Sequence, residues 1–299
     1  MIHSLKIYTI YSISVNNIEI DYNEIPKDIH EFTKDFIGFF KLNKDIWTNT
    51  ESIDLIINFN NQKNKLLFVA AINGHLEVVK YLHQNGANIN AENDYASIRY
   101  AAENGHLEVV KYLHQNGANI HADNNWALAL AADYGHLEIV KYLHQNGANV
   151  HENNVNVLTF AAENGHLEVV KYLHQNGANI NAVNDYPLRW AAENGHLEVV
   201  KYLYNNGANV RENNNWALRY AARNGHLAVV KYLIENGASI NAKKDYPLIW
   251  AAEKGHLEVV KYLIENRASI DTYNYKSAMI QAIAYGHLEI IEYLESINQ

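Results

Sequence analysis

The chain has no cysteine and only 3 prolines among its 299 residues. Without cysteine it can form no disulfide, hold no thiolate-bound metal and use no cysteine nucleophile. The opening stretch MIHSLKIYTIYSISVNN mixes Tyr, Thr and Ser among its isoleucines, so it lacks the uniform apolar core of a signal peptide. No apolar run reaches the roughly 18 residues that a membrane helix needs. We therefore expect an intracellular protein that neither enters nor crosses a membrane.

Positive charge is also scarce, with 24 Lys and Arg against 33 Asp and Glu, and a net charge of −9. Proteins that bind nucleic acid without sequence preference need a basic surface that neutralises phosphates. We therefore expect no nucleic-acid partner. Asn, Ile, Lys and Tyr are abundant instead, a bias that favours A/T-rich codons and carries no information about chemistry.

A repeated tetrapeptide dominates the sequence. Gly-His-Leu-Glu, or a near match, recurs every 30 or 31 residues, beginning at Gly74, Gly105, Gly135, Gly165, Gly195, Gly225, Gly255 and Gly286. Self-similarity at a fixed period of this size is typical of a solenoid, in which each unit contacts only its neighbours. The length of the chain is then no guide to the number of globular domains.

Each repeat predicts two helices. In residues 184–210, Asp185 is suited to capping a first helix, and apolar residues recur at helical spacing from Leu188 onward. The Asn-Gly pair ending at Gly195 predicts a tight turn, because glycine readily adopts positive φ. A second helix should run from about Leu197 to Asn206 and end at Gly207, with Glu198 and Lys201 paired on its solvent side.

These features resemble the ankyrin repeat, from about Leu66 to the C-terminus. The motifs that carry the resemblance are the Asn-Gly turn, HLEVVKYL, NGAN and INA. The composition and the short repeat are similar to those of the ankyrin families of mimivirus-like giant DNA viruses, which implies a viral protein in the host cytoplasm. The resemblance implies an all-α, ankyrin-type α-solenoid of stacked helix-turn-helix repeats. About eight repeats would span residues 65–299, the last a degenerate C-terminal cap with Glu292 and Glu295 on its outer face.

The repeat is shorter than the ankyrin period of about 33 residues. The deficit lies between Ala182 and Pro187, so we expect short inter-repeat loops in place of β-hairpins. Large rings stand where ankyrin repeats usually have Leu, and we expect them to fill the space that the missing hairpin leaves. They are Tyr100, Phe160, Trp190, Tyr220 and Trp250.

Residues 1–64 do not repeat and are expected to form a small α+β segment. LKIYTIYSISV-NN-IEIDY predicts two strands around an Asn-Asn turn, and residues 28–40 and 51–59 predict amphipathic helices. The segment is interpreted as a cap for the solenoid or as a docking module. IPKDIHEF resembles the opening of an F-box, which implies the alternative of an adaptor that recruits a substrate to a ubiquitin ligase.

Sixteen histidines invite a metal-site hypothesis, which the spacing opposes. Ligands of one zinc ion lie about 2 Å from the metal, whereas equivalent positions in stacked helices lie about 10 Å apart. The pair His196 and Glu198 recurs in nearly every unit, whereas catalysis needs one unique constellation in a pocket. We therefore predict no metal, no cofactor, no catalytic residue and no enzymatic activity.

The ankyrin resemblance implies that a partner protein binds a concave groove lined by the end of each first helix and the adjacent loop. The alternative is that these polar residues merely solvate the surface. The predicted partner-binding residues are Asp94, Glu103, Asn104, Asn125, Trp126, Asp133, Tyr134, Glu163, Asp185, Tyr186, Glu193, Asn215, Trp216, Arg223, Asp245 and Lys254. The function expected is that of a monomeric, non-catalytic protein–protein interaction scaffold. The Asn residues of the INA loops (Asn90, Asn181 and Asn241) also resemble asparagines that a factor-inhibiting-type oxygenase hydroxylates in other ankyrin proteins.

Overall fold

A computed structural model describes residues 63–90, 96–150, 157–266, 268 and 272–297. These residues form helices joined by turns, and no strand occurs among them, which confirms the predicted all-α class. The chain divides into two compact units, Met1–Ala122 and Asp123–Gln299. The strands and helices predicted for residues 1–62 lie outside the described residues.

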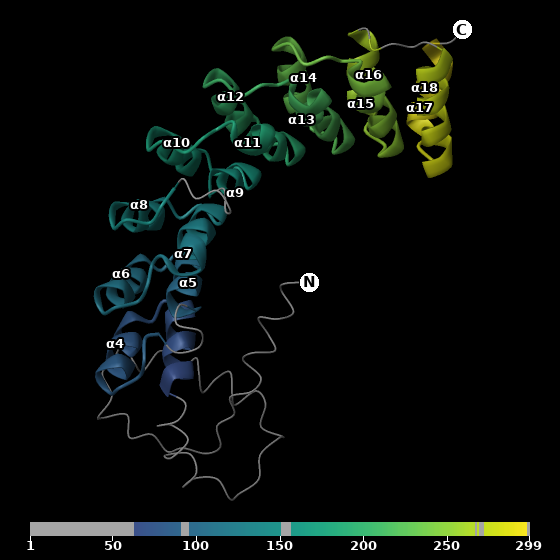
Figure 1. Cartoon of the computed structure of the whole chain (residues 1–299). Coiled ribbons are helices and arrows are strands. Elements are labelled where there is room, and N and C mark those ends of the chain that lie inside the picture. Colours follow the sequence, from purple (N-terminus) through teal and green to yellow (C-terminus); the bar gives the residue numbers. More distant parts are fainter. Residues whose placement is uncertain (1–62, 91–95, 151–156, 267, 269–271, 298–299) are drawn as a thin grey trace, which may run out of the picture. The chain divides into compact units, whose positions relative to one another are not determined.

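The first unit begins its described part with a helix over residues 63–72. Three further helices follow, α4 (Leu76–Gln84), α5 (Ala96–Glu103) and α6 (Leu107–Gln115). Helix α6 packs against both α4 and α5 (Figure 1). Ile98, Val110 and Leu113 are almost completely buried between these helices. The unit is therefore held by the apolar stripes that the repeat pattern predicted.

The second unit alternates first and second helices of successive repeats (Figure 1). The first helices are α7 (Ala122–Asp133), α9 (Val157–Glu163), α11 (Ala182–Glu193), α13 (Glu212–Arg223), α15 (Ala242–Glu253) and α17 (Thr272–Tyr285). The second helices are α8 (Leu137–Gln145), α10 (Leu167–Gln175), α12 (Leu197–Asn205), α14 (Leu227–Glu235), α16 (Leu257–Glu265) and α18 (Leu288–Ile297).

From α9 to α17 each first helix packs on the next first helix, and from α8 to α18 the second helices do the same. The core lies between these two layers. In one repeat the side chains of Leu188, Val200 and Leu203 are completely buried, as are the two alanines Ala191 and Ala192. Burial of a Leu or Val side chain stabilises a fold by roughly 1.5–3 kcal/mol, so the stacking of repeats supplies most of the stability.

The glycine of a Gly-His pair such as the one at Gly195 is required for two reasons. Gly195 has φ 81°, a backbone conformation that side chains rarely adopt. A Cβ atom there would also lie 2.5 Å from Nδ1 of His226, the equivalent histidine of the next repeat. The His226 ring packs on this bare backbone, and its Nε2 donates a hydrogen bond to the carbonyl oxygen of Glu193 at 2.9 Å. The Gly-His pair therefore joins neighbouring repeats.

The inter-repeat loop is a left-handed turn that the sequence did not predict. Three successive residues before the straight part of α11 have positive φ: Val183 (49°), Asn184 (59°) and Asp185 (59°). The same turn precedes the straight parts of α7 and α13, at residues 123–125 and 213–215, where all the residues are Asp or Asn. Asn and Asp tolerate this conformation best among residues with a side chain, which accounts for the polar loops.

The prediction that Asp185 caps α11 was wrong. Its carboxylate accepts a hydrogen bond from the backbone N–H of Asn209 in the next loop, at 3.3 Å. Asn181, the residue before α11, forms no side-chain cap. The left-handed turn directs this side chain toward the following repeat instead of back over its own helix. Burial raises the pKa of the Asp185 carboxyl group.

The last repeat has a mixed outer surface. Glu292 and Glu295 are exposed, in keeping with their predicted place on a polar outer face. Large apolar side chains are exposed beside them, because no further described helix packs on α17 and α18. Ile280, Ile283 and Leu288 keep 60%, 59% and 69% of their surface accessible, so the polar face is incomplete.

Candidate binding surface

The first helices of the second unit carry a row of half-buried rings, which we call the aromatic row. It consists of Trp126, Phe160, Tyr186, Trp190, Trp216, Tyr220, Tyr246 and Trp250. Within one helix the rings are four residues apart, which places them on one side of it. We call this side of α7 to α15, which the second helices leave uncovered, the first-helix face.

Rings of the aromatic row contact one another both within a helix and between neighbouring repeats. Trp216 and Tyr220 stack with ring centroids 4.4 Å apart, and Tyr246 stacks on Trp250 at 5.2 Å. Tyr220 meets Trp250 edge to face at 5.3 Å. Such ring pairs stabilise beyond their buried area, so part of the row contributes to the stability of the fold. The rings still keep part of their surface open to solvent.

Two arginines lie beneath these rings. The Arg189 guanidinium carbon is 4.3 Å from the Tyr186 ring centre and 3.9 Å from that of Trp216. Arg219 lies 5.5 Å from the ring centres of both Trp216 and Trp250. Arg189 and Arg219 are only 7% and 4% exposed, and the buried Nε of each has no hydrogen-bond partner. Their positive charges are thus held by aromatic faces, with no carboxylate at ion-pair distance among the described residues.

Carboxylates occupy the other end of the first-helix face. Asp133, Glu163 and Glu193 end successive first helices at equivalent positions and are half-buried. Burial raises the pKa of the Glu163 carboxyl group, and the neighbouring Asp133 and Glu193 raise it further. Burial also raises the pKa of Glu193, which the Trp216 side chain and the positive charges of Arg223 and Arg189 partly offset. Glu163 thus lies between two carboxylates of its own sign, and perturbed carboxyl groups of this kind cluster at functional sites.

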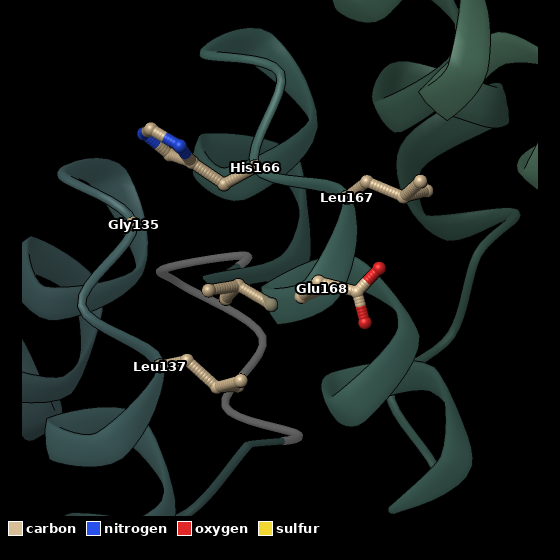
Figure 2. A pocket seen from close by; sticks show the side chains of 6 residues that line it. Gly135, Leu137, His166, Leu167 and Glu168 are labelled. Atoms are coloured by element: carbon tan, nitrogen blue, oxygen red, sulfur yellow. The ribbon is translucent and has the colours of Figure 1, made fainter.

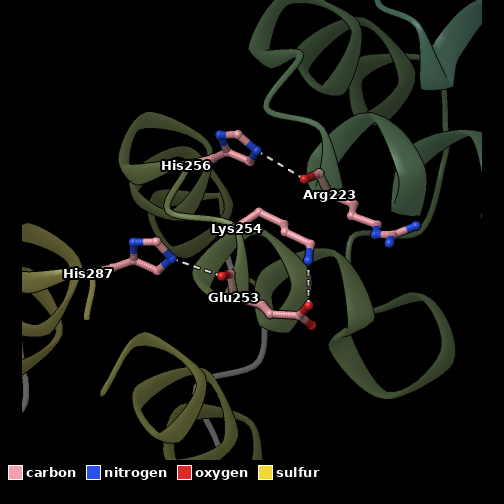
Figure 3. Close-up of polar contacts among 5 residues, drawn as sticks. All are labelled: Arg223, Glu253, Lys254, His256 and His287. Atoms are coloured by element: carbon pink, nitrogen blue, oxygen red, sulfur yellow. Dashed lines mark hydrogen bonds and ion pairs between the residues drawn. The ribbon is translucent and has the colours of Figure 1, made fainter. Parts of the chain in front are cut away.

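The same position is an arginine in one later repeat and a carboxylate again in the next (Figure 3). Arg223 replaces the carboxylate, and its guanidinium lies over the Tyr220 and Trp250 rings at 5.6 and 5.8 Å. Glu253 follows, with its carboxylate 2.9 Å from Nζ of Lys254. The carbonyl oxygens of Arg223 and Glu253 accept hydrogen bonds from the imidazoles of His256 and His287 at 3.0 and 2.8 Å. The first-helix face is therefore acidic over α7 to α11 and gains cations from α11 onward.

Three predicted partner-binding residues are buried in the stack. Asn125, Asp185 and Asn215 are 5%, 5% and 8% exposed. Each side-chain oxygen accepts a hydrogen bond from a backbone N–H of the next loop, and for Asn215 the distance to the Ser239 nitrogen is 2.7 Å. These oxygens satisfy backbone groups that stacking would otherwise leave without partners. They hold repeats together and are not available to a partner protein.

The other predicted residues are distributed over both units. Glu103 is buried, and Asn104 donates a hydrogen bond from its side chain to the Tyr100 carbonyl oxygen at 2.7 Å. Tyr134 is 46% exposed. The structure does not describe the side chains of Asp94 and Asp245. The first-helix face brings together Trp126, Asp133, Glu163, Tyr186, Glu193, Trp216, Arg223 and Lys254.

The histidines form structural ladders. On the second helices, Nδ1 of His83, His144 and His174 lies 2.8 or 2.9 Å from the hydroxyl of Tyr112, Tyr172 and Tyr202 in turn. In the Gly-His turns the imidazoles bond to carbonyl oxygens of the preceding repeat, as His166 does to Asp133 at 2.8 Å. Across the part of the chain that the structure describes, no group of His, Asp or Glu is placed to hold a metal ion.

A hollow of about 250 Å³ lies beside Gly135, Leu137 and the start of α10 (Figure 2). It contains His166 and Glu168, equivalent to the histidine–glutamate pair considered above. The two side chains point to different sides, and each has another partner. The imidazole bonds to the Asp133 carbonyl, and Glu168 pairs with Lys171 at 2.7 Å. The hollow thus presents no acid–base pair to a substrate.

Arg189 and Arg219 were not among the partner-binding residues predicted from the sequence. The signal was present, because both stand at the position of the ankyrin Thr-Pro-Leu-His histidine, as in Tyr186-Pro187-Leu188-Arg189. Trp190, Tyr220 and Trp250 were predicted only to fill space. Their partial exposure depends on how far apart neighbouring helices lie, which no local pattern specifies.

Among the described residues, every helix is too short or too polar to span a membrane.

The family model for ankyrin repeats matches residues 46–124, 98–184, 158–244 and 241–298. Among solved structures, the human ASB11 ankyrin repeat domain is similar, with 28% sequence identity and a TM-score of 0.60. The similarity covers 68% of this chain and 98% of that one. No curated protein matches the chain in sequence.

Proposed function

The chain belongs to the ankyrin repeat family, and from this premise we propose that it is a non-catalytic scaffold that binds a partner protein through its first-helix face. Ankyrin repeats are protein-interaction modules, whereas the identity of the surface is our own inference. The observation that carries it is the row of half-exposed Trp and Tyr rings with charged residues on the first helices. Trp, Tyr and Arg are the residue types that contribute most to protein–protein binding energy.

The distribution of sequence variation supports the same face. The second helices repeat LEVVKYL almost unchanged, with Glu138, Glu168 and Glu198 each paired to the lysine three residues on. The first helices vary in charge and in ring type at equivalent positions. A repeat protein can distinguish one partner from another only where its repeats differ.

Matched charge reversals test this proposal. A partner would first be identified by cross-linking mass spectrometry in expressing cells and then purified. Reversal of Asp133, Glu163 and Glu193 to Lys should slow association at least tenfold, because complementary charges mainly raise the association rate. The control variant reverses the same number of charges, at Glu138, Glu168 and Glu198. These residues lie on the second helices. Equal effects of both triple variants on the association rate would refute the assignment of the face.

The alternative function, an adaptor for a ubiquitin ligase, rests on IPKDIHEF within residues 1–64. This motif lies outside the described residues, and the boundary near residue 64 stays a prediction. Deletion of residues 1–64 separates the two proposals. A scaffold keeps its partner after the deletion, whereas an adaptor keeps its partner and loses the ligase components. We also propose that the protein is intracellular, of viral origin and monomeric.

A further inference from the structure

The last two described helices, α17 and α18, pack against each other and leave one side of the pair uncovered (Figure 1). We call this side the end face and define it by Ile280, Ile283, Leu288 and Ile291. The first three keep more than half of their surface accessible to solvent. Ile291 is half-buried, whereas Val230 at the equivalent position of an earlier repeat is completely buried. Apolar side chains gathered on a surface in this way mark a site of interaction.

The end face corresponds to the side that each earlier repeat turns toward the next one. Ile283 stands at the position of Ala222, which is completely buried. A Cβ atom on Gly225 would lie 2.5 Å from Nδ1 of His256 in the following repeat, whereas one on Gly286 would meet no described atom within 4 Å. The last repeat differs from the earlier ones in having no described repeat after it. It therefore exposes the surface that a following repeat would cover.

Two exposed glutamates border the end face where earlier repeats have other residues. Glu292 stands at the position of Lys231, whose Nζ lies 5.3 Å from the ring centre of Tyr262 in the following repeat. Glu295 stands at the position of His174, whose Nδ1 lies 2.9 Å from a tyrosine hydroxyl in the following repeat. Both positions thus point toward whatever packs next, and in the last repeat both are acidic.

A further ankyrin repeat would fit the end face poorly. The position of Ile283 is a completely buried alanine in each of the earlier repeats, and the larger side chain would overpack a helix that approached equally closely. Glu292 also removes the cation that lies over a tyrosine ring of the next repeat, so this attraction would be lost. A second copy of the chain, docked end face to end face, would bring Glu292 and Glu295 toward carboxylates of their own sign.

We propose that the end face binds a partner protein through a basic amphipathic helix. The apolar side of that helix would cover Ile280 and Ile283, while Lys or Arg at its edge would face Glu292 and Glu295, which are neighbours on α18. The described residues contain no strand whose edge a partner's strand could extend, which favours a helix. Lys276, in the first turn of α17, is the only Lys or Arg of these two helices. The proposal concerns a second surface and does not depend on the first-helix face.

The test uses the full chain and a phage-displayed library of helical peptides of about 18 residues, or roughly five turns. Each peptide has an alanine-based scaffold with one side randomised. The selected peptides should carry apolar residues three and four positions apart, with Lys or Arg beside them. A synthetic copy with Glu in place of every Lys and Arg should bind at least tenfold more weakly in fluorescence polarisation, because complementary charges would become like charges.

Two variants of the protein locate the binding site. Ile280→Ser combined with Ile283→Ser should weaken binding of the basic peptide at least tenfold. Glu292→Lys combined with Glu295→Lys should reverse the preference, so that the acidic copy binds more tightly than the basic peptide. All four side chains are exposed, so both variants should keep the helical circular dichroism and the denaturation midpoint of the wild type.

A matched control replaces Glu168 and Glu198 by Lys, two exposed glutamates on the second helices of earlier repeats, and should leave both affinities unchanged. Selection of no peptide, or of peptides indifferent to Ile280→Ser and Ile283→Ser, would refute the proposal. Peptides that need these isoleucines but carry no basic residues would refute the choice of a basic helix. A dimer in analytical ultracentrifugation that Ile283→Ser abolishes would show that a second copy covers the end face, and would equally overturn it.

Discussion

Val183 is the one apolar, β-branched residue in the left-handed turns of the described loops. Its φ is 49° and its ψ is 53°, whereas the equivalent residue in a neighbouring repeat, Asn213, has φ 48° and ψ 50°. The same backbone conformation thus carries a poorly suited side chain in one repeat and a well-suited one in another. We predict that Val183→Asn stabilises the protein and that Asn213→Val destabilises it.

The magnitude follows from two opposing effects. A left-handed helical conformation costs a residue with a Cβ atom roughly 1–2 kcal/mol, and Asn recovers much of this through local hydrogen bonds. Val183 is 54% exposed, so its replacement removes about half of the valine burial, or roughly 0.7 kcal/mol. The net gain from Val183→Asn should be about 0.5–1 kcal/mol. Asn213 is also exposed, and Asn213→Val should cost a similar amount.

Guanidinium denaturation followed by helical circular dichroism measures both changes. The midpoint should rise for Val183→Asn and fall for Asn213→Val, with the slope of the transition unchanged. The denaturation midpoint of the double variant should lie close to that of the wild type if the two loops act independently. Midpoints that move in the same direction, or a loss of stability on Val183→Asn, would refute the account of strain in the turn.

Four further predictions concern the stack. Leu203→Ala should cost about 2–5 kcal/mol in urea denaturation and Leu294→Ala less, because no further described helix packs on α17 and α18. Gly195→Ala should lower the denaturation midpoint, since a Cβ would meet the His226 ring at 2.5 Å on a backbone with φ 81°. Burial lowers the pKa of His226 from its usual 6.5, so the unfolded chain binds more protons just below that pH. Stability should therefore decline as the pH falls below about 6.5, and His226→Gln should reduce that slope in denaturant titrations at several pH values. Asn181 is exposed, and co-expression with a factor-inhibiting-type oxygenase should add the mass of one oxygen atom to the intact protein.

Each of these four predictions has an outcome that would contradict it. Equal losses at Leu203 and Leu294 would speak against a one-dimensional array. A stable Gly195→Ala variant would mean that the His226 ring moves aside without cost. If His226→Gln left the dependence of stability on pH unchanged, other titratable groups would be its cause. An unmodified intact mass would show that the resemblance of the INA loop does not extend to hydroxylation.

The sequence by itself determined the period, the helices and the core. Leu188, Val200 and Leu203 are buried as their spacing predicted, since helical periodicity fixes which side of a helix is apolar. Gly195 and Gly207 have positive φ where turns were expected. The pairing of Glu198 with Lys201 at 2.7 Å was also predictable, because residues three apart are neighbours on any helix.

Only the tertiary structure decided which polar groups meet across repeats. Asp185 was expected to cap its helix and face a partner, but a left-handed turn directs it to the backbone of Asn209. Arg189 was unremarked in the sequence, yet stacking places it between the rings of Tyr186 and Trp216. The physical reason is that periodicity describes one helix at a time. The burial and charge of a side chain at an interface depend on the offset between repeats, which arises only when they pack together.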